Sequence, residues 1–317
     1  MTTDSPLRSV VSSLIFQNPI VLAAGTAGYG EELTGVMRVE ALGGLVTKAV
    51  SLMPRDGAPR PRVAEFAGGM INAVGLANPG LAAVRRDQIP WLATHLTQSR
   101  KIINVVGFTV DEYSAVVAGL EEAMDGEHFA AVDAFELNVS CPNVKAGGLE
   151  FGADPSALEA VVHGVRRATR RPVFVKLSPT LTNIGVAARI AADAGADGIS
   201  VVNTAPGLVI DVDRRRPALG FGTGGVSGAA ILPVGVLATW RVRRAVTLPI
   251  FGLGGVRSGA DALQYIVAGA SLVGVGTAAM RDPRAPERIV RELAAWCRRH
   301  AVRDIQELSG SLEWPDA

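Results

Sequence analysis

With 317 residues, of which 48% are apolar and 19% charged, the chain has a composition that excludes an intrinsically disordered protein. The formal net charge of +1 provides no basic field for nucleic acid, so we expect no nucleic-acid partner. The length suits one large α/β barrel, and we expect a single domain over residues 1–317.

The sequence gives no sign of export or of a membrane anchor. Residues 1–8 lack a charged segment followed by an apolar one, so no signal peptide is expected. The chain has no run of 18 apolar residues free of Gly, Pro and charge, so no membrane span is expected. Cys141 and Cys297 form no CxxC or Cys/His pattern, which predicts neither a disulfide framework nor a metal site. This cysteine usage indicates a reducing, cytoplasmic location.

The first elements in chain order are a short apolar stretch at residues 10–16 and a turn at residues 17–19. They predict a small N-terminal hairpin that closes the bottom of a barrel. Eight short apolar runs follow, each with the length and composition of a buried strand. These runs are residues 20–24, 45–50, 102–107, 134–139, 172–177, 198–204, 249–255 and 272–277.

Helical patterns alternate with these runs. The clearest opens with Asp154-Pro155, an N-cap followed by a proline in the first turn, and continues to residue 170. Similar patterns cover residues 183–194, 258–268 and 286–300. The alternation predicts an α/β fold, a (β/α)8 TIM barrel. An open doubly wound sheet is the alternative, and it is less favoured because no G-x-G-x-x-G motif follows the first strand.

Three connections are longer than usual for a strand–helix loop. They span residues 51–79, 140–153 and 205–227, and each follows the carboxyl end of a predicted strand. Barrel enzymes build their sites on that face, so we interpret these long loops as folded lids on the C-terminal face. The dense charge run at residues 213–216 is expected to be a solvated loop tip.

Polar side chains recur where the apolar strands end. One such residue is usually a cap, but five on one barrel face are difficult to explain by packing, because buried polar groups need partners. The sequence therefore predicts a ligand site at this face. The five residues are Lys48, Asn104, Asn138, Lys176 and Asn203.

Glycine-rich turns follow the last two predicted strands, at residues 252–255 and 274–277. Backbone N–H groups without side chains can close on a phosphate, and barrel enzymes often bind phosphate at this place. A third glycine-rich rim lies at residues 224–228. Together these turns predict a phosphorylated cofactor.

Cys141 stands in a loop between Ser140 and Pro142, with Asn138 and Asn143 close in sequence. An isolated cysteine is usually a small buried apolar residue, and we assign that role to Cys297. The polar surroundings of Cys141 favour a reactive thiol that exchanges a proton with a ligand.

Long motifs give the chain a specific resemblance. They are Asn-Val-Ser-Cys-Pro-Asn-Val-Lys at residues 138–145, Gly-Gly-Met-Ile-Asn-Ala-Val-Gly-Leu at residues 68–76, and Val-Asn-Thr at residues 202–204. Over nearly its whole length the chain resembles class 1 dihydroorotate dehydrogenases, and the first two motifs are closer to subclass 1B than to 1A. In that subclass the catalytic chain pairs with a subunit that carries FAD and an iron–sulfur cluster ([2Fe-2S]), and electrons reach NAD⁺.

The resemblance implies FMN-dependent oxidation of (S)-dihydroorotate to orotate in pyrimidine biosynthesis, in a single FMN-binding domain. Cys141 would be the general base that removes a C5 proton while a hydride leaves C6 for flavin N5, and Lys48 would be the second catalytic residue. A homodimer core is also expected. The residues expected to bind substrate are Lys48, Asn72, Ala73, Val74, Gly75, Leu76, Asn138, Asn203 and Thr204.

The same resemblance implies a set of FMN contacts. Within it, a cation such as Lys176 near the pyrimidine end of the flavin would stabilise the anionic reduced form. One departure is that Ala24 stands where the family commonly has serine, so a hydroxyl contact to FMN is missing. The expected contacts are Ala24, Gly25, Lys48, Ala49, Asn104, Asn138, Lys176, Val202, Gly228, Gly254, Gly255, Gly276 and Thr277.

Two other functions fit parts of this pattern. Another FMN barrel oxidoreductase, acting on a dihydropyrimidine or on tRNA dihydrouridine, also uses a cysteine beside a proline. The tRNA-acting type needs a basic surface or an RNA-binding extension, which the near-neutral charge disfavours. A non-catalytic flavin-binding scaffold is disfavoured because both Cys141 and Lys48 are present.

Overall fold

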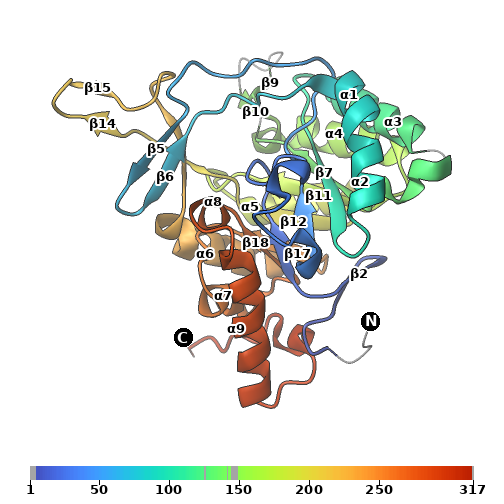
Figure 1. The fold of residues 1–317 in the computed structure, drawn as a ribbon, viewed down its shortest axis with the longest axis vertical. Helices are drawn as coiled ribbons and strands as arrows, with labels where there is room; N and C mark the ends of the chain where they lie inside the picture. Colours follow the sequence, from blue (N-terminus) through green and yellow to red (C-terminus); the bar gives the residue numbers. More distant parts are fainter. Residues whose placement is uncertain (1–4, 125, 141, 144–148, 316–317) are drawn as a thin grey trace.

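The computed structural model describes residues 5–124, 126–140, 142–143 and 149–315. Within these residues, eight parallel strands close into a barrel, as the sequence predicted (Figure 1). Each observed strand lies within or overlaps one predicted run, and the last residues of several runs belong to the loops instead. In barrel order from the first, the strands are β3 (Ile20–Leu22), β4 (Gly44–Val46), β7 (Arg100–Val105), β8 (Ala134–Asn138), β11 (Val173–Leu177), β12 (Gly198–Val201), β17 (Ile250–Leu253) and β18 (Leu272–Val275).

Helices surround the barrel, and the four predicted segments are all helical. In α4, Asp154 caps the first turn by accepting hydrogen bonds from the N–H groups of Ser156 and Ala157 at 2.9 and 3.1 Å. Other helices follow weaker patterns that the sequence did not delimit. The helices in the predicted segments are α4 (Pro155–Ala168), α5 (Ile184–Asp193), α7 (Gly259–Ala268) and α9 (Ala285–Arg299), of which α9 begins one residue earlier than predicted. The others are α1 (Gly80–Ala83), α2 (Ile89–His95), α3 (Val110–Ala123), α6 (Leu232–Arg243) and α8 (Thr277–Arg281).

Two apolar clusters hold the barrel together. The larger one lies between strands and helices, because side chains alternate across each strand and one face meets the helix layer. The smaller one fills the barrel interior with residues such as Ile102, Phe174 and Phe251. Val11 and Phe16, buried residues of the hairpin β1 (Ser9–Val11) and β2 (Leu14–Phe16), belong to the interior cluster. The hairpin therefore closes the barrel at one end, as predicted.

The long loops after β4 and β12 combine into a second sheet, which the sequence did not predict. Its strand order is β13 (Ala205–Gly207), β16 (Gly224–Ser227), β6 (Gly69–Asn72) and β5 (Val63–Phe66), all antiparallel. The pairing of β6 with β16 joins segments that are far apart in the chain. The expected lids after β4 and β12 are thus one continuous structure rather than two separate loops.

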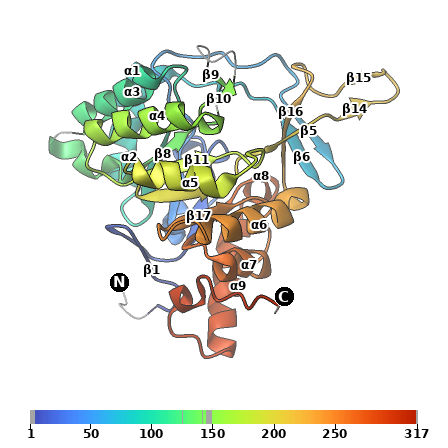
Figure 2. The same cartoon turned by 180° about the vertical axis from the view of Figure 1, so that it is seen from behind.

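Two further hairpins extend from the C-terminal face. The pair β14 (Ile210–Asp211) and β15 (Arg216–Pro217) projects to one side of the barrel in both views (Figures 1 and 2). The charge run 213–216 forms its exposed tip, as expected. The loop after β8 contains β9 (Pro142–Asn143) and β10 (Leu149–Glu150). Among the residues described, the helices are too short or too polar to cross a membrane.

Candidate active site

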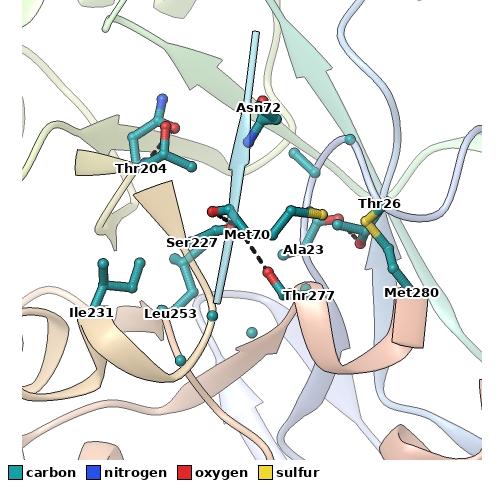
Figure 3. A pocket seen from close by; sticks show the side chains of 18 of the residues that line it. Ala23, Thr26, Met70, Asn72, Thr204, Ser227, Ile231, Leu253, Thr277 and Met280 are labelled. Atoms are coloured by element: carbon teal, nitrogen blue, oxygen red, sulfur yellow. Dashed lines mark hydrogen bonds between the residues drawn. The ribbon is translucent and has the colours of Figure 1, made fainter. Parts of the chain in front are cut away.

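A cavity of about 340 Å³ opens at the C-terminal ends of the barrel strands, bordered by the second sheet. Figure 3 shows Ser227 of that sheet in contact with Thr277 of α8 at the edge of the cavity, with Met70 beside them. Most of the predicted site residues line this one cavity. They are Ala24, Gly25, Lys48, Ala49, Asn72, Val74, Leu76, Asn104, Asn138, Lys176, Val202, Asn203, Thr204, Gly228, Gly254, Gly255, Gly276 and Thr277.

Three predicted residues are not among the lining residues. The N–H of Ala73 donates to the carbonyl of Arg62 at 2.8 Å, which turns this residue toward the neighbouring chain segment. Gly75 has φ +70°, and a Cβ there would stand 2.4 Å from the backbone nitrogen of Ala58. These contacts tie both residues to the segment before β5, and neither lines the cavity. Cys141 lies outside the described residues.

An amide pair lies at one side of the cavity. Asn203 donates from Nδ2 to Asn138 Oδ1 at 3.2 Å, and Asn203 Oδ1 accepts the N–H of Thr204 at 2.8 Å. Both amide oxygens thus have a partner within the protein, while the Nδ2 group of Asn138 donates to no other described residue and can donate to a ligand. This part of the wall therefore offers hydrogen-bond donors.

A hydrogen-bond acceptor for the ligand comes from the second sheet. Asn72 donates from Nδ2 to the carbonyl of Gly225 at 3.2 Å, which leaves its Oδ1 as an acceptor on a residue that lines the cavity. Figure 3 shows Asn72 and Thr204 near each other at this side of the cavity. A planar ring that carries both N–H and C=O groups can satisfy the two kinds of amide at once.

The cavity contains two lysines with different surroundings. Lys176 is 5% exposed, and its ammonium group lies 3.4 Å from Glu136 Oε1. Lys48 lines the same cavity, and within the described residues its ammonium group has no hydrogen-bond or ion-pair partner. Since a partly buried cation without a partner favours an anionic ligand, Lys48 suits a carboxylate.

Beneath the cavity, Glu136 connects two of its lining residues. It accepts a hydrogen bond from Asn104 Nδ2 at 2.8 Å in addition to its contact with Lys176. Sequence reasoning missed Glu136. A signal was present, because Glu136 has the same parity in its strand as Asn138 and must face the barrel interior.

Glycine turns form the end of the cavity near β17 and β18. Gly255 has φ +76°, and a Cβ there would come within 2.7 Å of the backbone nitrogen of Leu232. Among the described residues, the N–H groups of Gly255 and Gly276 donate to no acceptor of the chain. Unpaired N–H groups on a surface that excludes side chains are a suitable cradle for a phosphate.

Direct contacts fasten the second sheet to this end. Thr277 donates from Oγ1 to Ser227 Oγ at 2.8 Å, shown as a dashed line in Figure 3. Arg281 of α8 donates to Glu65 of β5 at 3.1 Å. No sequence pattern predicts these contacts, because they join segments that only the folded chain brings together.

The loop after β6 enters the cavity through Leu76, which has φ +58°, an unfavourable value for a side chain of this size. Leu76 packs against buried Ala49 and Val106, so the packing offsets the backbone strain. Val74 and Leu76 therefore form an apolar border beside the polar amides.

Glu150 lies in β10, in the same loop after β8 as Cys141. Its Oε1 accepts hydrogen bonds from Ser178 and Thr180, both at 3.3 Å, while Oε2 is buried and has no partner among the described residues. Burial raises the pKa of the Glu150 carboxyl above its usual value, against the lowering effect of the two hydroxyls.

Comparisons with known proteins identify the family of the chain. The dihydroorotate dehydrogenase family model matches residues 7–296. The chain is 46% identical to a protein of Desulforudis audaxviator over 95% of each chain, and 45% identical to one of Geobacter sulfurreducens over 96% of this chain and 97% of the relative. Both relatives are named dihydroorotate dehydrogenase B (NAD(+)), catalytic subunit. Since the match covers nearly the whole chain, this protein belongs to the dihydroorotate dehydrogenase family, in class 1B.

Proposed function

We propose that this chain is the catalytic subunit of an NAD⁺-linked dihydroorotate dehydrogenase, which oxidises (S)-dihydroorotate to orotate with bound FMN. The observation that carries the proposal is the cavity itself. It combines the ammonium group of Lys48, which has no partner in the described part of the chain, with amides of opposite polarity, beside glycine turns suited to a phosphate. Family membership supports the same reaction.

The chain's side chains match dihydroorotate group by group. Lys48 pairs with the carboxylate, because an unpartnered cation gains most from a charged acceptor. Asn72 Oδ1 accepts from a ring N–H, and Asn138 Nδ2 donates to a ring carbonyl. Val74 and Leu76 cover the apolar edge of the ring and exclude water.

The residues at the other end of the cavity fit FMN. The phosphate is assigned to the turns that contain Gly228, Gly254, Gly255, Gly276 and Thr277. The N–H groups of Gly255 and Gly276, which donate to no acceptor of a described residue, support this assignment. Lys176 and Asn104 meet the polar edge of the flavin ring. Ala24 and Gly25 offer only backbone groups, because Ala24 has no hydroxyl. Bound FMN supplies the hydride acceptor.

Proton transfer is assigned to Cys141. In its thiolate form it takes the C5 proton of the substrate held by Lys48 and the three asparagines, while the C6 hydrogen leaves as a hydride. A positioned base of this kind contributes roughly 10²–10⁴-fold to a reaction rate. The local assignment follows from the Asn-Val-Ser-Cys-Pro-Asn sequence that continues from β8.

We further propose that electrons leave through a partner subunit carrying FAD and [2Fe-2S], and that the catalytic chain forms a homodimer in the cytoplasm. The names of the relatives support the partner, since each is a catalytic subunit linked to NAD(+). The isolated chain is therefore expected to reduce NAD⁺ poorly.

An anaerobic absorbance titration tests the proposal. The purified chain should show a flavin spectrum, and added dihydroorotate should bleach it. A spectrum that stays oxidised with dihydroorotate would contradict the substrate and leave the flavin assignment standing. A chain that takes up no FMN would contradict the assignment of the glycine turns.

A further inference from the structure

Glu136 is fully buried, with 0% of its surface exposed. Its Oε1 receives the hydrogen bond from Asn104 at 2.8 Å and the contact from Lys176 at 3.4 Å, whereas Oε2 has no partner among the described residues. Burying a carboxylate with one oxygen unpartnered is unfavourable, unless other groups gain from its presence. The two groups that gain from Glu136 are Asn104 and Lys176.

Those two groups reach the cavity from neighbouring strands. Asn104 is on β7, Glu136 on β8 and Lys176 on β11, and these strands are adjacent in the barrel. Asn104 and Lys176 line the cavity, while Glu136 is not among its lining residues. Any influence of Glu136 on a ligand is thus exerted through Asn104, through Lys176 or through its charge.

The first consequence is a fixed amide orientation. An ionised carboxylate only accepts hydrogen bonds, so Asn104 must direct Nδ2 toward Glu136. The Asn104 Oδ1 then remains as the group that faces other partners, and it can only accept. Glu136 therefore determines that Asn104 offers an acceptor, suited to a ring N–H of a bound cofactor.

The second consequence concerns charge. The positive charge of Lys176 is compensated by Glu136 at 3.4 Å, while Lys48 has no such anion among the described residues. At low effective dielectric, two charges at this distance interact strongly. The field that Lys176 exerts on a neighbouring ring is therefore much weaker than that of a lone ammonium group.

We propose that Glu136 is a positioning residue that sets the reduction potential of the bound flavin, by orienting Asn104 and by compensating the charge of Lys176. This inference rests on the proposed function insofar as the ring in the cavity is a flavin. Reduction adds negative charge to that ring, and a less compensated Lys176 would favour the reduced form. The native carboxylate therefore keeps the potential lower than Lys176 alone would set it.

The test is a redox titration of the FMN-loaded chain with indicator dyes, without dihydroorotate. Glu136→Gln keeps the shape and removes the charge, so the potential should rise. We expect about a tenfold larger ratio of reduced to oxidised flavin at a fixed ambient potential, or about 30 mV for a two-electron couple. Glu136→Asp keeps the charge on a shorter side chain, so its flavin potential should lie between those of the native chain and Glu136→Gln.

Asp133→Asn is the matched control. Asp133 is also a nearly buried carboxylate, 3.6 Å from the buried ammonium group of Lys101, but neither residue lines the cavity. The same charge change there should leave the flavin potential unaltered. A general effect of destabilisation would instead alter the potential in both variants.

The dissociation constant of FMN is a second measurement, for a variant that retains too little flavin for a redox titration. The dissociation constant of FMN, measured by flavin fluorescence with the refolded or apo chain, should rise at least tenfold for Glu136→Gln and should not change for Asp133→Asn. If Glu136→Gln does not fold by circular dichroism, the same two measurements on Glu136→Asp decide. A native potential in a folded, FMN-loaded Glu136→Gln variant would overturn the inference, and so would a native dissociation constant in a variant whose potential cannot be measured.

The outcomes separate this inference from the proposed function. A native chain that binds no flavin contradicts the proposed function, and the inference with it. A native flavoprotein that dihydroorotate does not reduce contradicts only the proposed substrate. A native flavoprotein whose potential and affinity are indifferent to Glu136 contradicts only the positioning role.

Discussion

Asn203 Nδ2 lies 3.2 Å from Asn138 Oδ1, although one follows β12 and the other ends β8, with β11 between these strands. The contact holds the Asn138 amide with its donors free for a ligand. Asn203→Ala should therefore weaken orotate binding through Asn138 as well as directly, by about tenfold to a hundredfold, because a lost buried hydrogen bond costs about 1–3 kcal/mol. Titration of the flavin spectrum with orotate measures this.

A double-mutant cycle with Asn138→Ala checks the coupling. If the two asparagines act as one unit, the loss for the double variant should be clearly smaller than the sum of the two single losses. Flavin content should remain native in all three variants. Strictly additive losses would mean that the hydrogen bond seen between the two amides has no influence on the ligand.

Lys48→Met should weaken the binding of orotate more than the binding of 5,6-dihydrouracil. The substitution removes the ammonium group and keeps the apolar stem, and only orotate carries a carboxylate. Because charge-assisted hydrogen bonds contribute about 1.5–3 kcal/mol, orotate should lose at least tenfold in affinity. Equal losses for both ligands would show that Lys48 does not contact the carboxylate.

Cys141→Ser should lower the rate of flavin bleaching by dihydroorotate roughly 10²–10⁴-fold at pH 7, and the remaining rate should rise with pH. A serine hydroxyl is a much poorer base precursor than a thiol, so its activity needs higher pH. Anaerobic stopped-flow absorbance measures both effects, and flavin and orotate binding should persist.

Cys297→Ala serves as the control for the thiol. Cys297 is fully buried in α9, and burial raises the pKa of its thiol, so it has no role as a base. The bleaching rate of Cys297→Ala should be native. A Cys141→Ser variant with a native rate and native pH dependence would remove the general-base assignment.

The barrel could be predicted because its signals are local. Each buried strand is a short apolar run, and the dipeptide Asp154-Pro155 predicts the start of the capped helix α4. The second sheet could not be predicted, because its central strands β6 and β16, which set Ile71 opposite Val226, lie in two loops far apart in the chain with no common pattern. The large sequence separation between the paired strands is therefore what prevents a prediction of this sheet from the sequence.

The site also contains residues that the local sequence predicts and contacts that only the fold reveals. Lys48 and Asn138 could be found because polar residues interrupt apolar strands. Glu136 interrupts β8 in the same way, yet its partners become visible only when β7 and β11 stand beside β8. The polarity of each amide, which decides what ligand fits, depends on contacts across the barrel and not on the local sequence.

Glu150 should make stability fall as pH rises above its unfolded pKa. Burial raises the pKa of this carboxyl in the folded state above the usual 4.5, so the folded chain binds more protons than the unfolded chain just above that value. The free energy of unfolding should therefore decrease through this window and level off above the folded pKa. Urea denaturation at a series of pH values from about 4 to 8 measures the slope.

Glu150→Gln should flatten that part of the profile and raise stability near neutral pH. The glutamine keeps an acceptor for Ser178 and Thr180 without the charge that burial disfavours. The comparison with the native chain at pH 4, where the carboxyl is largely protonated in both states, is the internal control. A Glu150→Gln variant with the native slope would show that another group titrates in this window.

Gly255→Ala should lower both the stability of the chain and its affinity for FMN. The residue has φ +76°, and the new Cβ would stand 2.7 Å from the backbone nitrogen of Leu232, so the turn must move. Gly35→Ala is the matched control, because Gly35 has φ +84° and no atom lies within 4 Å of its Cβ position. The control should lose only about 1–2 kcal/mol of stability from its left-handed backbone, and Gly255→Ala should lose more.

The ligand comparison makes this experiment specific for the phosphate. If the turn at Gly255 holds the phosphate, Gly255→Ala should weaken FMN binding much more than riboflavin binding. The preference of the chain for FMN over riboflavin should then become smaller. Gly35→Ala should leave both affinities native, since Gly35 does not line the cavity. Fluorescence titration of each apo variant with FMN and with riboflavin gives four affinities, each of which is compared with that of the native chain. An unchanged preference for FMN in Gly255→Ala would place the phosphate elsewhere, because a displaced turn cannot keep its N–H groups on the same oxygen atoms.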